Sequence, residues 1–239
     1  MRLQDFKALT FDCYGTLIDW ESGILAAFGP WRKRTGSSAD DNRLLELFAE
    51  AESRIQAEQP TILYPDALAL GLQRIGEKLK APATAGETRA FGQSVKDWPA
   101  FPDSAAALAY LKQYYKLVVL SNIDRASFAH SNKKLGVTFD AVVTAQDVGS
   151  YKPALRHFEV GLETLAKMGV PKDKVLHTAQ SLFHDHVPGK KIGLATMWIN
   201  RRAGKSGGGA TMPVGAVKPD GEVPSMAALV ELHRREIGA

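Results

Sequence analysis

The chain has very little cysteine and no long apolar segment. Its 239 residues contain a single cysteine, Cys13, so no disulfide can form within the chain, which is typical of a reducing compartment. No run of about 18 apolar residues is present, which argues against a helical membrane span. The opening residues MRLQDFKALTFD also lack the apolar segment of a secretory signal. The sequence therefore predicts a cytoplasmic protein with no membrane partner.

A strong excess of one charge is also missing. The 30 basic and 26 acidic residues leave a net charge of only +4. The basic residues stand in scattered pairs such as Lys133-Lys134 and Arg201-Arg202, without a basic stripe interleaved with aromatics. We therefore expect no nucleic-acid partner. A composition of 45% hydrophobic and 23% charged residues is that of an ordinary globular protein, long enough for one large domain or for one domain with an insertion.

Short apolar segments alternate with helical patterns over most of the chain. Predicted strands cover residues 7–12, 116–121, 140–145, 174–179 and 194–199. Predicted helices cover residues 103–115, 124–135, 153–168 and 183–192, with Pro153 in the first turn of its helix. Strands separated by helices are typical of a parallel α/β sheet, whose strands are buried on both faces.

One interval interrupts this alternation. Residues 20–98 have helical character and no convincing strand, with helices expected at 41–58, 65–79 and 86–96. The simplest interpretation is a helical cap of residues 20–98 inserted into a core domain of residues 1–19 and 99–239. Near the C-terminus, residues 203–222 are rich in Gly and Pro and are predicted to form a surface loop before a last helix at 225–236.

Polar residues follow several of the predicted strands. In open parallel sheets, ligands bind beyond the carboxyl ends of the strands. An acid (Asp12), a hydroxyl and amide pair (Ser121-Asn122), a lysine (Lys152) and a second acid (Asp185) come after different strands or in the loops that follow them. Each residue alone is weak evidence, but their order and spacing together predict a catalytic site.

These residues resemble the four motifs of the haloacid dehalogenase (HAD) superfamily. The motifs in this sequence are Phe11-Asp12-Cys13-Tyr14-Gly15-Thr16-Leu17, Leu120-Ser121-Asn122, Tyr151-Lys152-Pro153 and the late Asp185. The resemblance covers the whole chain, including a helical cap after the first motif. It implies a Rossmann-like core in which Asp12 is a nucleophile that forms a covalent aspartyl intermediate.

Two departures from the superfamily bear on the reaction. Its phosphatases use a second Asp two positions after the nucleophile as a general acid and base. Here this position is Tyr14, whose phenol, with a pKa of about 10, is a poor substitute. A Gly-Asp would also be expected where Ala179-Gln180 stands, so one carboxylate ligand for Mg²⁺ is absent. We therefore expect no metal and no cofactor. Tyr14 is instead what the L-2-haloacid dehalogenase branch carries.

The resemblance to this branch implies a hydrolytic dehalogenation. Asp12 would attack C2 of a short 2-haloalkanoic acid and displace the halide, which leaves as a stable anion without an acid catalyst. Asp185 would then activate or position the water that hydrolyses the aspartyl ester. Lys152 would contact Asp12 and fix the charge of Asp185. Its positive charge would also offset the repulsion between the anionic substrate and the anionic nucleophile.

Several further residues are expected to bind the substrate or the halide. Ser121 and Asn122, with backbone amides near Tyr14 and Gly15, would hold the substrate carboxylate, and Thr16 would orient Asp12. The branch places an arginine for the halide in its first cap helix, and Arg54 is the nearest match. The alternative for Arg54 is an exposed residue paired with Glu50 or Glu58.

Aromatic residues and a histidine are expected around the substrate. Trp20, Tyr64, Trp98 and Phe183 would form apolar walls, although Trp98 and Phe183 equally fit ordinary core positions. Of the two histidines that flank Asp185, one, His184 in our assignment, would line the site, the alternative being polar contacts of a loop. Zinc is disfavoured because no cysteine or third histidine clusters nearby. Cys13, His157 and His177 are interpreted as ordinary structural residues.

Two competing functions stay open from the sequence. One is a phosphatase of the same superfamily that acts on a small phosphate ester. The other is a module that has kept the fold for ligand binding without catalysis. The leading prediction is a metal-independent dehalogenase whose partners are a small 2-haloacid and the halide, with a homodimer implied by the family resemblance. The sequence leaves the preferred halogen and chain length open.

Overall fold

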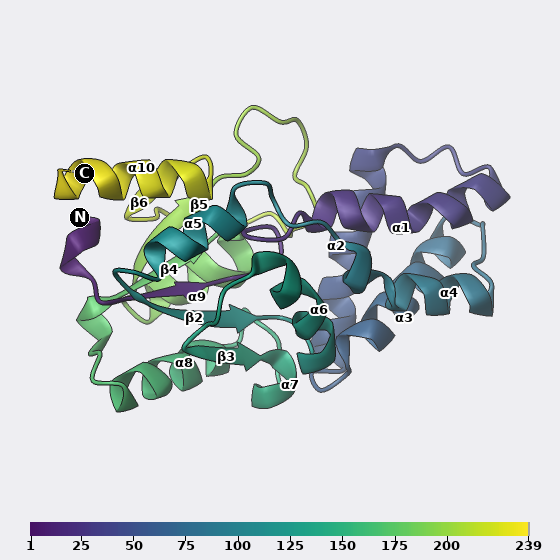
Figure 1. Cartoon of the computed structure of the whole chain (residues 1–239). Helices are drawn as coiled ribbons and strands as arrows, with labels where there is room; N and C mark the ends of the chain where they lie inside the picture. Colours follow the sequence, from purple (N-terminus) through teal and green to yellow (C-terminus); the bar gives the residue numbers. More distant parts are fainter. Residues whose placement is uncertain (239) are drawn as a thin grey trace.

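A six-stranded, fully parallel sheet forms the centre of the molecule in the computed structural model, which describes residues 1–238 (Figure 1). The strand order is β3-β2-β1-β4-β5-β6. The strands are β1 (Ala8–Phe11), β2 (Lys116–Ser121), β3 (Ala141–Thr144), β4 (Val175–Ala179), β5 (Ala195–Ile199) and β6 (Gly221–Val223). The five predicted strands are confirmed. The sixth lies at the end of the segment predicted to be a loop, so that prediction was wrong for residues 221–222.

The alternation of side chains along the strands divides the core into two layers. Leu117 and Val119 of β2 belong to the apolar cluster that includes α5 (Ser104–Leu111), α6 (Arg125–Leu135) and α10 (Met226–Ile237). Val118 and Leu120 belong instead to the cluster that includes α8 (Arg156–Lys167). Successive side chains of a strand point to opposite faces, so a strand that is apolar at every position is covered by helices on both sides.

Most predicted helices are confirmed, with shorter bounds where the capping residues require it. α6 begins after Asp124, whose side chain accepts a hydrogen bond from the amide of Ser127, and ends at Gly136 with positive φ. α8 begins only at Arg156, so Pro153 lies in the turn before the helix and not in its first turn as predicted. The predicted helix over 183–192 divides into a widened helical turn (Leu182–His186) and α9 (Val187–Lys191). A short helix, α7 (Ala145–Val148), was not predicted.

A group of helices lies beyond one end of the sheet, at the right of Figure 1. It consists of α1 (Trp20–Thr35), α2 (Asp41–Glu58), α3 (Tyr64–Lys78), α4 (Ala85–Gly92) and a short 3₁₀ turn (Ser94–Asp97). This is the helical cap expected from the sequence, and the bounds of α2 agree with the prediction. The cap has aromatic packing of its own, with Phe28 in contact with Trp31 and Phe91.

The chain leaves the sheet for the cap and returns from it at adjacent positions. The amide of Asp19 donates a 2.8 Å hydrogen bond to Pro99 O, and the amide of Phe101 donates one of 3.0 Å to Leu17 O. Two crossings held side by side are what an inserted unit of residues 20–98 requires. The proposed division into a core and a cap rests on this pairing.

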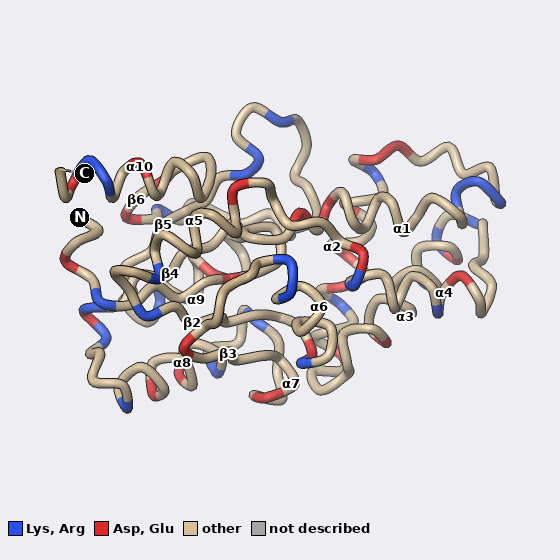
Figure 2. Tube along the Cα trace, viewed as in Figure 1, with Lys and Arg blue, Asp and Glu red and all other residues tan. Residues whose placement is uncertain are grey.

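Charged residues are distributed over the whole molecule (Figure 2). Lys and Arg alternate with Asp and Glu along the trace, in the cap as well as around the sheet. Within residues 1–238, no helix is both long and apolar enough to cross a membrane.

Candidate active site

A small buried cavity of about 30 Å³ lies between the carboxyl ends of the strands and the cap. It has room for a water molecule in this conformation. Seven of its lining residues come from the sheet side, and all of these except Ser181 were predicted for the site; three more come from the cap. The lining residues are Asp12, Tyr14, Asn122, Lys152, Ser181, His184 and Asp185 from the sheet side, with Trp20, Glu52 and Tyr64 from the cap.

The ammonium group of Lys152 joins the two aspartates of the cavity. Lys152 Nζ lies 3.0 Å from Asp12 Oδ1 and 2.7 Å from Asp185 Oδ1, and all three side chains are buried. Its third hydrogen bond, of 2.8 Å, goes to the backbone oxygen of Leu120. The predicted contact between Lys152 and Asp12 is therefore present, and the ammonium has used all three of its protons.

Shared burial shifts the pKa values of these groups in different directions. Burial and the charge of Asp185 raise the pKa of Asp12, against the opposing effects of Lys152 and Thr16. Burial would also raise the pKa of Asp185, but Lys152 and His177 outweigh it and lower that pKa far below its usual value. Burial would lower the pKa of Lys152, but the two carboxylates outweigh it, so the pKa is raised. The cluster therefore holds Lys152 charged and Asp185 ionised.

Thr16 holds Asp12 from the side opposite Lys152. Its hydroxyl donates a 2.8 Å hydrogen bond to Asp12 Oδ2 and accepts one of 2.9 Å from the amide of Gln180. The predicted contact with Asp12 is present. Since Thr16 is fully buried and does not line the cavity, it orients the carboxylate and is out of reach of a substrate.

Asp185 is fixed by a histidine that sequence reasoning missed. His177 Nε2 lies 3.0 Å from Asp185 Oδ1, and His177 Nδ1 lies 2.8 Å from the hydroxyl of Thr10. Thr10 and His177 are register partners on β1 and β4. We interpreted His177 as an ordinary strand residue because the pairing of these two strands cannot be read from the sequence. In this position His177 holds the carboxylate of Asp185 in place through the contact with Oδ1.

The predicted binding site for the substrate carboxylate is only partly present. Asn122 lines the cavity, but its amide group binds the main chain of Lys152, with distances of 3.0 Å from Nδ2 to O and 2.7 Å from Oδ1 to N. The side chain of Ser121 does not line the cavity, and the amide of Gly15 donates to Ile18 O. Among the described residues the buried hydroxyl of Ser121 has no hydrogen-bond partner, and the Gly15 amide is used by the turn, so neither group faces the cavity in this conformation.

The predicted aromatic walls divide into two groups. Tyr14, Trp20 and Tyr64 line the cavity, and the Tyr14 hydroxyl lies 2.8 Å from Ser131 Oγ. Trp98 is buried behind them, edge-on to Tyr14 with ring centres 5.6 Å apart, so it supports the wall without forming it. Phe183 does not line the cavity either and packs against His184. The alternative of a core position fits Trp98, whereas Phe183 is only half-buried and belongs to neither apolar cluster.

The two histidines beside Asp185 point in different directions. His184 lines the cavity as predicted and lies 3.1 Å, through Nδ1, from Ser181 Oγ. His186 turns away and binds Ala179 O through Nε2 at 2.9 Å. Burial lowers the pKa of each to about 4, so both rings are neutral at pH 7. Cys13 is fully buried in the core, as expected.

Arg54 is not part of the cavity, and its assignment to the halide was wrong. Its side chain is 78% exposed and pairs with Glu58 at 2.8 Å, one turn further along α2. This is the alternative considered from the sequence. The residue of α2 that lines the cavity is Glu52, which is buried and accepts a 2.7 Å hydrogen bond from the hydroxyl of Tyr64. The resemblance to the family implied an arginine in this helix, so the sequence did not point to an acid.

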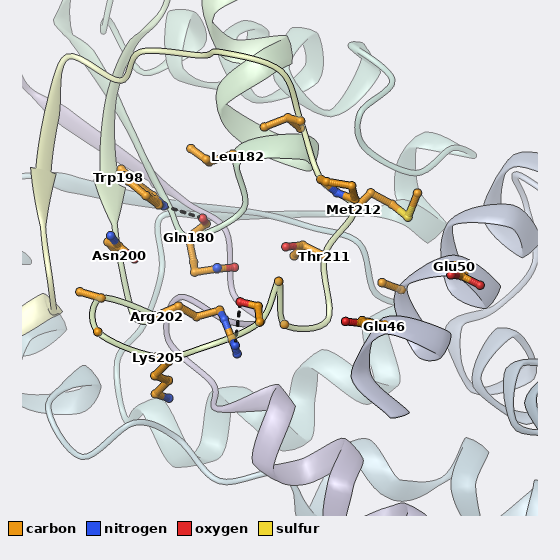
Figure 3. A pocket seen from close by; sticks show the side chains of 18 residues that line it. Glu46, Glu50, Gln180, Leu182, Trp198, Asn200, Arg202, Lys205, Thr211 and Met212 are labelled. Atoms are coloured by element: carbon orange, nitrogen blue, oxygen red, sulfur yellow. Dashed lines mark hydrogen bonds between the residues drawn. The ribbon is translucent and has the colours of Figure 1, made fainter. Parts of the chain in front are cut away.

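A second, much larger pocket of about 830 Å³ lies beside this cavity (Figure 3). It is bounded by Glu46 and Glu50 of α2 on one side and by the loop that carries Arg202 and Lys205 on the other. None of the three charged motif residues lines it. The pocket and the Asp12–Lys152–Asp185 cluster are linked through Gln180, whose side chain lines the pocket and whose backbone amide donates to Thr16.

Comparison with known proteins gives consistent results. The family model of the haloacid dehalogenase-like hydrolases matches residues 6–178. The (S)-2-haloacid dehalogenase of Pseudomonas sp. (strain YL) is 29% identical over 242 residues, which cover 97% of this chain and 96% of the relative.

Two solved structures have the same fold at low sequence identity. An L-2-haloacid dehalogenase from Xanthobacter autotrophicus with chloropropionic acid covalently bound has a TM-score of 0.77 and 20% identity, with 96% of this chain and 98% of the other covered. A magnesium-bound HAD hydrolase from Bacillus subtilis has a TM-score of 0.76 and 16% identity, with 98% and 100% covered. One backbone therefore serves both kinds of protein, and the side chains have to decide the chemistry.

Proposed function

Because the chain belongs to the haloacid dehalogenase-like hydrolases, we propose that it removes the halide from short 2-haloalkanoic acids and releases 2-hydroxy acids. The observation that carries this proposal is the buried Asp12–Lys152–Asp185 cluster, in a cavity where Tyr14 takes the position of the phosphatase acid. The curated relative from Pseudomonas, a 2-haloacid dehalogenase over nearly its full length, supports the same substrate class.

In the first half of the reaction, Asp12 acts as the nucleophile. One carboxylate oxygen attacks C2 of the substrate in line with the carbon–halogen bond, which breaks with inversion at C2 and leaves halide and an aspartyl ester. Thr16 and Lys152 hold the two oxygens of Asp12 in place. The covalently bound chloropropionic acid in the Xanthobacter relative supports an intermediate of this type.

In the second half, water hydrolyses the ester. Water adds to the carbonyl carbon of Asp12, the ester bond to the substrate oxygen breaks, and the 2-hydroxy acid leaves as the carboxylate of Asp12 is restored. One proton is released to solvent, so the overall change consumes one haloacid and one water and yields hydroxy acid, halide and H⁺. Asp185, whose Oδ2 has no hydrogen-bond partner among the described residues, is suited to orient this water.

Isotope labelling tests the covalent step directly. In a single turnover of bromoacetate in H₂¹⁸O, we expect mass spectrometry to find ¹⁸O on Asp12, because water attacks the enzyme's own carbonyl. Label that appears only in the glycolate of that first turnover would mean that water attacks the substrate, and the covalent mechanism would be wrong. Asp12→Asn should release no bromide while keeping the circular dichroism spectrum of the wild type.

A second assay separates this proposal from the phosphatase alternative. We expect halide release from chloro-, bromo- or fluoroacetate to continue in the presence of EDTA. Hydrolysis of p-nitrophenyl phosphate that depends on Mg²⁺, with no halide release from any of the three acids, would establish the phosphatase instead.

A further inference from the structure

The cavity contains one acid that the proposed reaction does not use. Glu52 of α2 is 5% exposed and lines the same cavity as Asp12 and Lys152. Its Oε1 accepts a hydrogen bond from Tyr64, and it has no basic partner among the described residues. Two positions along the helix, Arg54 points to solvent. The helix therefore turns a carboxyl group, and not a cation, toward the nucleophile.

The charges around the cavity leave little room for a further anion. Asp12 and Asp185 carry two negative charges and Lys152 one positive charge, while burial keeps His184 neutral at pH 7. The other titratable groups near Glu52 are phenols that burial keeps neutral, namely Tyr14, Tyr64 and Tyr151. The cavity thus holds about one net negative charge before Glu52 is counted. Ionised Glu52 and a bound carboxylate would together bring it to three.

This repulsion is large enough to decide binding. Two like charges about 4 Å apart in a partly buried site weaken binding by roughly a thousandfold. A protonated carboxyl group has the opposite effect, because its O–H can donate a hydrogen bond to the anion. Few other donors are free, since Lys152 and the amide of Asn122 are already bound to the protein.

The surroundings of Glu52 allow both protonation states near neutral pH. Burial raises the pKa of Glu52 to about 7, with a smaller rise from the charge of Asp12, while the hydrogen bond from Tyr64 opposes the shift. A small change of pH, or the arrival of an anion, is therefore enough to change its state.

We propose that Glu52 is a specificity-determining residue that admits a small carboxylate only in its protonated form, in which it donates a hydrogen bond to the bound anion. Binding above neutral pH then takes up one proton from solvent onto Glu52. The inference rests on the proposed function for its choice of a carboxylate as ligand. It does not depend on the bond that is later broken.

Binding of glycolate, which carries no halogen, tests this proposal without catalysis. By calorimetry between pH 6 and 9, we expect the Kd of the wild type to rise about tenfold per pH unit above pH 7. Glu52→Gln keeps a neutral hydrogen-bond donor and should have a Kd that is independent of pH. The matched control is Glu50→Gln on the same helix, which should follow the wild type because Glu50 is exposed and pairs with Lys78.

Proton uptake provides a second measurement that needs no variant. At pH 8.5, wild-type binding heats in buffers of different ionisation enthalpy should show uptake of nearly one proton per glycolate. Equal pH profiles for the wild type and Glu52→Gln, no proton uptake, or no glycolate binding by either protein would overturn the assignment. If these binding results hold but bromoacetate yields no bromide, the proposed reaction is wrong and the role of Glu52 stands.

Discussion

Replacement of Lys152 by methionine tests the electrostatic basis of the site. Methionine is also long and unbranched, so Lys152→Met removes the charge with a small change in volume. The ammonium loses its contacts with Asp12 at 3.0 Å, Asp185 at 2.7 Å and Leu120 O at 2.8 Å. Two carboxylates then remain buried without a cation between them.

The structure predicts which carboxylate responds. Asp185 keeps its 3.0 Å contact with His177, whereas Asp12 keeps only the hydroxyl of Thr16 and already has a raised pKa because it is buried. Asp12 should therefore take up the proton. Loss of a charge pair worth about 4 kcal/mol raises the pKa of Asp12 further, so less of it is ionised and the rate at pH 7 should fall by more than about tenfold. Breaking a buried ion pair should also cost about 3–5 kcal/mol of unfolding free energy.

Bromide release from bromoacetate between pH 6 and 9.5, together with urea unfolding, measures both effects. The rate of Lys152→Met should rise about tenfold per pH unit, since ionised Asp12 is recovered as pH increases. The control is Lys78→Met, whose exposed pair with Glu50 should contribute less than about 1 kcal/mol. A Lys152→Met rate within tenfold of the wild type at pH 7, or a reduced rate that does not depend on pH, would refute this reasoning.

Three further predictions follow from the contacts of single residues. Thr16→Val removes the hydrogen bond to Asp12 Oδ2, worth about 1.5–3 kcal/mol for a charged acceptor, so kcat should fall roughly 10–100-fold with little change in KM. Arg54→Ala should leave the rate of bromide release unchanged and should change the unfolding free energy by less than about 0.5 kcal/mol, because Arg54 is exposed. A tenfold loss of rate would instead support Arg54 as a ligand of the halide. Burial lowers the pKa of His157 to about 3 in the folded state, so the stability linked to its neutral form is present above pH ~6.5 and is lost as pH falls toward 3. Urea midpoints of His157→Leu should therefore decline less than those of the wild type between pH 6.5 and 4, and parallel curves would contradict this.

The sequence predicted most of the fold because the strands are fully buried. Apolar segments such as residues 116–121, with helices on both sides in the sequence, are predicted as buried parallel strands. Ligands bind at the carboxyl ends of such strands, which predicts that Asp12, Lys152 and Asp185 lie close together. β6 was not predicted because its residues, Gly221–Val223, contain no apolar run; the strand forms by pairing with β5. Such an edge strand depends on tertiary contacts that composition does not encode.

To predict which cap residue lines the cavity, one has to know which face of α2 points toward the sheet, and a comparison of motifs does not give this. Positions 52 and 54 differ by about 200° around a helix, so only one of them can face the cavity. Leu45, Phe48 and Ile55 are buried, and Glu52 falls on the same stripe, at four residues from Phe48 and three from Ile55. An acid on the apolar side of an amphipathic helix was the signal in the sequence that could have identified it.

The charge of the cavity gives a reason to prefer a haloacid to a phosphate ester as the proposed substrate. A phosphate monoester carries a charge near −2 at pH 7, and a haloacid carries −1. Added to the net charge of about −1 from Asp12, Asp185 and Lys152, the phosphate would bring the buried total to −3 even with Glu52 protonated. The haloacid would bring it to −2, with the proton of Glu52 available to the anion. A carboxylate at position 14 or 180 with Mg²⁺ would reverse this balance, and the chain has tyrosine and glutamine there. Under the proposed function, one lysine and one protonated acid would face a monoanion, which needs less neutralisation than the dianion of a phosphate ester.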